Sequence, residues 1–131
     1  MNVLLPTTLC LAAAALVVNF WLGMRIGKLR HAHNVSVGDG GNEMIMRRMR
    51  AQLNFVEQTP LILIGIGLVE LAGKGGAWLA PAGAVFMIGR ICHAIGMDGP
   101  FKAGRPIGVI TAMLMSIVLV VVAVMASLGK M

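Results

Sequence analysis

The sequence predicts an all-α protein, an integral-membrane four-helix bundle that forms a single domain over residues 1–131. Hydrophobic residues make up 58% of the chain and charged residues only 12%, about half the charged share of a typical soluble domain. Four apolar stretches follow one another along the chain, each close to the ~20 residues that a helix needs to cross a bilayer. These observations exclude a soluble enzyme domain, and the presence of only two cysteines excludes a disulfide scaffold.

The first and last stretches are the most apolar. The first predicts a helix at about residues 4–27. Because no basic segment precedes its apolar run, we expect this helix to be retained rather than cleaved as a signal peptide. The last stretch predicts a helix at about residues 106–128, with no charged residue from 109 to 128.

The two middle stretches predict helices at about residues 43–72 and 77–97. A short glycine-rich turn at residues 73–76 joins them, so these helices should be antiparallel neighbours. Lys74 in this turn follows Glu70 by four residues, and we expect the two side chains to pair. The ionisable residues in the apolar parts of the two stretches are Glu57, Glu70, Arg90 and His93.

The basic residues predict the orientation of the helices. Most of them flank the loops between the first and second and between the third and fourth helices, namely Arg25, Lys28, Arg30, Arg47, Arg48, Arg50, Lys102 and Arg105. Because cytoplasmic loops are enriched in Lys and Arg, we expect a multi-pass protein with both loops in the cytoplasm, in a bacterial inner membrane or an equivalent membrane. Long apolar runs separate these residues, so no nucleic-acid partner is expected.

A polar stripe marks the start of the second helix. Arg47, Arg50, Asn54 and Glu57 are spaced three, four and three residues apart, which places them on an arc of about 80° at ~100° per residue. A carboxylate within the membrane costs about 2.5 kcal/mol or more, so Asn54 and Glu57 should face the bundle and have partners. For Arg47 and Arg48, contact with lipid headgroups is the alternative interpretation.

The third helix offers a second polar face. Arg90, His93 and Met97 project within about 60° of one another. Arg90 could pair with a glutamate of the bundle or contact a ligand directly. Guanidinium, amide and carboxylate groups together suit a small zwitterion that is rich in carboxylates, and the apolar helices could hold a lipophilic second substrate. No metal is expected, because the histidines lack matching cysteine or carboxylate spacing.

Two segments resemble a known family. RAQLNFVEQTP at Arg50–Pro60 resembles the signature of the membrane-associated proteins in eicosanoid and glutathione metabolism (MAPEG), which include the microsomal glutathione transferases, and GRICHAIG at Gly89–Gly96 follows in the expected order. The resemblance implies a homotrimer that holds glutathione between adjacent subunits near the cytosolic face. It implies that Arg105 stabilises the thiolate, and that glutathione is bound by Arg30, Arg47, Arg50, Gln52, Asn54, Glu57, Arg90 and His93.

The chain departs from the family in having no tyrosine. Gln58, His93 and Met97 stand where various members place tyrosines that touch glutathione, so activation by a tyrosine is excluded. The resemblance implies a glutathione transferase that acts on lipophilic electrophiles from the bilayer, or a reductase of lipid hydroperoxides. A non-enzymatic lipid-binding member is the alternative. A small four-helix drug exporter is a weaker one, because the first helix lacks the acidic residue on which such exporters rely.

Overall fold

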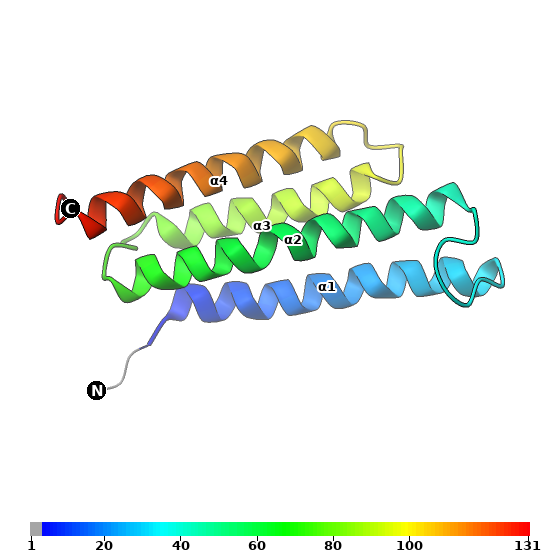
Figure 1. Cartoon of the computed structure of the whole chain (residues 1–131), viewed down its shortest axis with the longest axis horizontal. Helices are drawn as coiled ribbons and strands as arrows, with labels where there is room; N and C mark the ends of the chain where they lie inside the picture. The colour runs from blue at the N-terminus through cyan, green and yellow to red at the C-terminus, as the bar shows by residue number, and fades with distance from the viewer. Residues whose placement is uncertain (1–3) are drawn as a thin grey trace.

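The computed structural model describes residues 4–131 as a bundle of four antiparallel helices (Figure 1). These are α1 (Pro6–Ala32), α2 (Glu43–Leu71), α3 (Leu79–Gly96) and α4 (Gly104–Ser127). Each helix is long and apolar enough to cross a membrane. The all-α architecture with four membrane-length helices is therefore confirmed.

The helix bounds agree with those predicted from the sequence, except at the end of α1. The other three helices begin and end within two residues of the predicted positions, whereas α1 continues past residue 27 to Ala32. The added turn contains Lys28, Leu29 and Arg30, which are good helix formers. Basic residues in a last turn also interact favourably with the helix dipole. Arg30 is therefore held on a rigid helix rather than in the loop.

The helices pack mainly as two pairs, α1 with α2 and α3 with α4, and α2 and α3 also contact each other. α1 packs on α2 and α3, and α4 packs on the same two helices, while α1 and α4 do not touch within residues 4–131. Buried side chains such as Ile66 and Phe86 fill the interior. Outward-facing Leu16, Phe20 and Leu61 are each at least 70% exposed in the single chain. Such apolar exposure is typical of a surface that faces lipid or another subunit.

Two glycines hold the end of α3 against the start of α4. A Cβ atom built on Gly96 would lie 2.6 Å from the Arg105 nitrogen, and one built on Gly104 would lie closer still to the Cys92 carbonyl oxygen. Real Cβ atoms do not come so close to backbone, so only glycine permits this contact. The first residues of α4 are therefore placed by the end of α3.

At the opposite end of the bundle, Glu70 caps the N-terminus of α1. Its carboxylate accepts hydrogen bonds from the Thr7 and Thr8 backbone nitrogens, both at 2.8 Å, and from Thr8 Oγ1 at 2.6 Å. α1 has no side-chain cap of its own, and a helix N-terminus attracts a negative charge. The predicted pairing of Glu70 with Lys74 is therefore wrong. Lys74 Nζ instead donates to the Met131 carbonyl at 2.5 Å.

Candidate functional site

The α1–α2 and α3–α4 loops lie at the same end of the bundle, opposite the start of α1 and the end of α4 (Figure 1). The predicted binding residues gather toward this end because they lie on the last turn of α1, the first half of α2, the end of α3 and the start of α4. Most of these residues line one or the other of two cavities at this end. We call these the charged cavity and the α1–α2 cavity.

The charged cavity has a volume of about 270 Å³ and lies among α2, α3 and α4. A neighbouring cavity of about 350 Å³ shares Met97 and Arg105 with it and adds Arg47 and Lys102. The charged cavity is lined by Arg50, Leu53, Asn54, Glu57, His93, Met97 and Arg105. Residues from α2, α3 and α4 thus line one cavity.

Three charged side chains of this cavity have no partner within residues 4–131. Arg50, Glu57 and Arg105 are exposed, and none of them makes a hydrogen bond or ion pair within residues 4–131. The prediction that Glu57 faces the bundle and is paired is wrong for the single chain. Glu57 lies about 60° further around α2 than Asn54 at ~100° per residue, and this rotation carries it from the packed face to the outer face.

Asn54 is instead connected to the buried Arg90. Arg90 Nη1 donates to Asn54 Oδ1 at 2.6 Å, and Arg90 Nη2 donates to the Gly108 carbonyl. Arg90 is only 3% exposed, and its guanidinium lies 5.6 Å from the centre of the Phe86 ring. Pairing of Arg90 with a glutamate is therefore wrong. Arg90 orients the Asn54 amide, and the buried His93 lines the cavity beside it.

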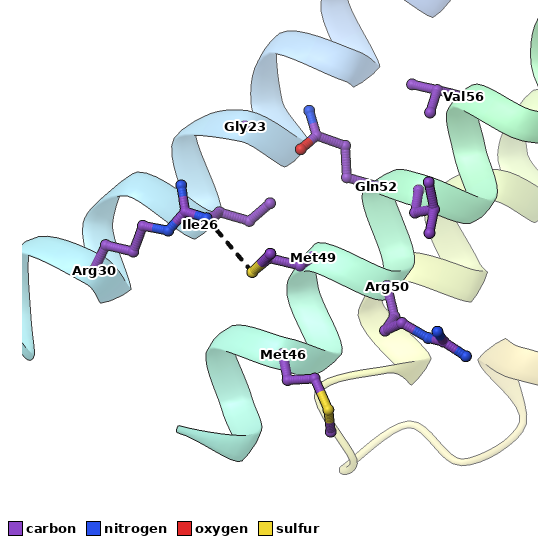
Figure 2. Close-up of a pocket in the computed structure, with 9 residues that line it drawn as sticks. Gly23, Ile26, Arg30, Met46, Met49, Arg50, Gln52 and Val56 are labelled. Carbon is purple, nitrogen blue, oxygen red and sulfur yellow. Dashed lines mark hydrogen bonds between the residues drawn. The ribbon is translucent and has the colours of Figure 1, made fainter. Parts of the chain in front are cut away.

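The α1–α2 cavity lies on the other side of α2 and has a volume of about 470 Å³ (Figure 2). Arg30 donates to the Gly38 carbonyl at 2.9 Å and contacts Met49 Sδ at 3.5 Å. Gln52 donates to Asn19 Oδ1 at 3.2 Å. Arg50 lines this cavity as well as the charged one, and its side chain extends away from Arg30 toward the α3–α4 loop in Figure 2. Arg30 and Gln52 are thus separated from Glu57 within one chain.

The other two arginines near the start of α2 have partners within the chain. Arg47 pairs with the exposed Glu43 at 2.6 Å, one turn earlier on α2. Arg48 donates to Asp98 and its side chain is 22% exposed, so the pairing leaves only a minor part of this side chain for lipid headgroups. The sequence alone does not predict the pairing of Asp98 with Arg48. The position of Asp98 immediately after the third helix, as an acid close to a basic loop, was the available signal.

A bundle of four membrane-length helices with ionisable side chains at one end defines a small multi-pass membrane protein. Within this class, the chain belongs to the MAPEG family, because the sequence model of that family matches residues 8–125. No curated protein and no solved structure gives a significant match. The family match covers both segments on which the resemblance was based.

Proposed function

We propose that this protein is a membrane-embedded glutathione transferase that works as a homotrimer. Glutathione would bind at the cytoplasmic end of the bundle, and a lipophilic electrophile would enter from the bilayer. The observation that carries this proposal is the charged cavity, where a carboxylate and two guanidiniums are presented without partners within residues 4–131. Glutathione carries an ammonium group, two carboxylates and a thiol, so its charges are complementary to these side chains.

The depth of Glu57 supports a site that another subunit covers. Glu57 is the central residue of α2, about 21 Å from either end at ~1.5 Å per residue. Any placement in which α2 spans the ~30 Å hydrocarbon core leaves Glu57 roughly 8 Å or more inside it. A carboxylate exposed to lipid at this depth is strongly unfavourable. A neighbouring subunit that covers this face, together with a bound ammonium group, removes the penalty.

The division of the predicted residues between two cavities supports the same assembly. Arg30 and Gln52 lie in the α1–α2 cavity, whereas Glu57 and Arg105 lie in the charged cavity. Within a single chain, a ligand that contacts both sets would have to pass around the outer face of α2, where Arg50 and Leu53 line both cavities. If the α1–α2 cavity of one subunit faces the charged cavity of the next, both sets surround one glutathione. In a homotrimer this contact occurs three times, and the three subunits form a closed ring.

The chemistry requires a thiolate and a site for its formation. The thiolate is the nucleophilic form of a thiol, and a guanidinium at the edge of a low-dielectric cavity favours that anion. Arg105 would therefore stabilise the sulfur while Arg50, Asn54 and Glu57 hold the peptide. The sulfur then forms a bond with the electrophilic carbon. In a substitution, the electron pair of the broken bond leaves with the departing group. In the opening of an epoxide, that electron pair remains on the ring oxygen.

The test is a titration of the purified protein with glutathione, followed by thiolate absorbance and by calorimetry. We expect saturable binding with formation of thiolate, and turnover of a chlorinated nitroaromatic substrate. Cross-linking in detergent should give trimers. Binding of lipid without binding of glutathione would contradict the proposal and indicate a lipid-binding member of the family.

The proposed orientation has its own test. Cysteines introduced at positions 36 and 102, in the basic loops, should react with an impermeant probe from the cytoplasmic side. A cysteine at position 75, in the α2–α3 turn, should react only from the opposite side. Labelling of position 75 from the cytoplasm would reverse the topology and move the glutathione site to the other face of the membrane.

A further inference from the structure

Asp98, just after the end of α3, joins three helices through one carboxylate. Arg25 of α1 donates from Nη2 to Asp98 Oδ2. Arg48 of α2 donates from Nε to Asp98 Oδ1 at 3.2 Å and from Nη2 to Oδ2 at 3.4 Å. The single negative charge of Asp98 thus accepts hydrogen bonds from two guanidiniums, one on α1 and one on α2. We call Arg25, Arg48 and Asp98 the Asp98 cluster.

Further contacts connect the members of the Asp98 cluster to one another and to neighbouring residues. Arg48 Nη1 donates to the Arg25 carbonyl at 3.0 Å, and Arg25 Nη1 donates to the Ala94 carbonyl at 3.3 Å. The Arg25 guanidinium also lies 4.7 Å from the centre of the Trp21 ring. The three charged side chains are only 11–23% exposed, so water screens them weakly. Charge-assisted hydrogen bonds in such surroundings hold their partners more firmly than exposed ion pairs do.

The Asp98 cluster is connected to Arg105 through a short segment. Met97, next to Asp98, lines both the charged cavity and its neighbour. The segment from 97 to 103 then leads to Gly104, whose backbone is in close contact with Gly96. Arg105 itself has no partner within residues 4–131, so the position of its guanidinium depends on the backbone that carries it. The Asp98 cluster and the Gly96–Gly104 contact are the two anchors of that backbone.

We propose that Asp98 is a positioning residue, which holds the α3–α4 segment so that Arg105 and Met97 stay at the charged cavity. This role rests on the proposed transferase function. Asp98 touches no reacting atom in this scheme, and its effect is transmitted through Arg105.

The experiment compares the purified full chain with Asp98→Asn, Asp98→Glu and a matched control, Asp39→Asn. Asp39 is an acidic residue at the same end of the bundle, and within residues 4–131 its side chain accepts only from the nearby Gly41 nitrogen. Hydrogen–deuterium exchange reports the anchoring directly, because the amides of residues 97, 98, 99 and 104 are hydrogen-bonded. Glutathione affinity, thiolate formed per bound glutathione and turnover report the effect on the site.

In Asp98→Asn we expect faster exchange over residues 97–104 and unchanged exchange over residues 58–70. Thiolate formation and turnover should fall roughly tenfold or more, since a displacement of about 1 Å can cost 10²-fold, while glutathione affinity changes less than about threefold. Asp98→Glu should restore part of each loss, and Asp39→Asn should match the parent. If Asp98→Asn does not fold, Arg48→Lys tests the same contact, because it keeps the charge but loses the forked geometry.

Two results would overturn the proposal. Unchanged exchange over residues 97–104 would show that Asp98 does not anchor the segment. Faster exchange with unchanged thiolate formation and turnover would show that the Asp98 cluster only stabilises the fold. Failure of the proposed function looks different, because the parent itself would then bind no glutathione. In that case the positioning role is also refuted, while the exchange data still report the anchoring.

Discussion

The end of the bundle around Glu70 and the charged cavity around Glu57 differ in how they satisfy a carboxylate. Both glutamates belong to α2. Glu70 accepts three hydrogen bonds from the first turn of α1, whereas Glu57 accepts none within residues 4–131. A carboxylate satisfied within its own chain contributes to folding. One left unsatisfied at membrane depth is available to a second subunit and a ligand, so the two regions should respond to substitution in opposite ways.

The largest effect is expected at Arg105, which lines the charged cavity. Arg105→Ala should lower turnover by about 10²-fold or more, as removal of one preorganised charge-stabilising donor does elsewhere. It should also raise the pKa of the bound glutathione thiol, while the dissociation constant changes much less. Turnover of a chlorinated nitroaromatic and thiolate absorbance measure both effects.

Lys28→Ala is the matched control for Arg105→Ala. Lys28 is exposed on α1 at the same end of the bundle, so its loss changes the surface potential without changing the cavity. Equal turnover in Arg105→Ala and the parent would move the stabilisation of the thiolate to another residue. The charged cavity would then be a binding site for the peptide part alone.

Glu57→Gln should weaken glutathione binding about ten- to hundredfold. Charge-assisted hydrogen bonds contribute roughly 1.5–3 kcal/mol, and the amide cannot replace the contact between carboxylate and ammonium. Stability should not fall, because the Glu57 side chain has no partner within residues 4–131 and the substitution removes a charge that is unfavourable at membrane depth. Calorimetry measures the affinity, and Glu70→Gln, the same change on the same helix, should leave it unaltered. Equal affinity in Glu57→Gln and the parent would remove Glu57 from the site.

The contrast between Glu57 and Glu70 also separates what the sequence predicts from what it does not. Helix bounds follow from apolar runs and local propensity, so α2 was predicted to within one residue. The polar stripe on α2 follows from helical geometry alone. The partners of Glu70 and Asp98 lie more than 45 residues away in the chain, and only the packing of the helices brings them together. The outward rotation of Glu57 likewise depends on how α2 is set against α3 and α4.

Glu70→Gln should lower the free energy of unfolding by about 0.5–2 kcal/mol, the range for loss of a helix N-terminal cap. The amide keeps one acceptor oxygen but loses the charge that the dipole of α1 favours. Reversible unfolding in mixed micelles measures the change. Thr8→Val, which removes only the hydroxyl donor, should show a smaller loss. Unchanged stability in both variants would mean that water caps α1 equally well.

The smallest effect is expected at Glu43, which pairs with Arg47 one turn later but is exposed to solvent. Glu43→Gln should lower the free energy of unfolding by only about 0.2–0.5 kcal/mol, and salt should screen even that. The same substitution frees the Arg47 guanidinium, which lines the cavity next to the charged one. If Arg47 contacts glutathione as the family resemblance implies, its release should strengthen binding slightly, by about threefold or less. Weaker binding in Glu43→Gln would instead mean that the ion pair itself holds Arg47 in place, and would move Glu43 from the solvated surface to the site.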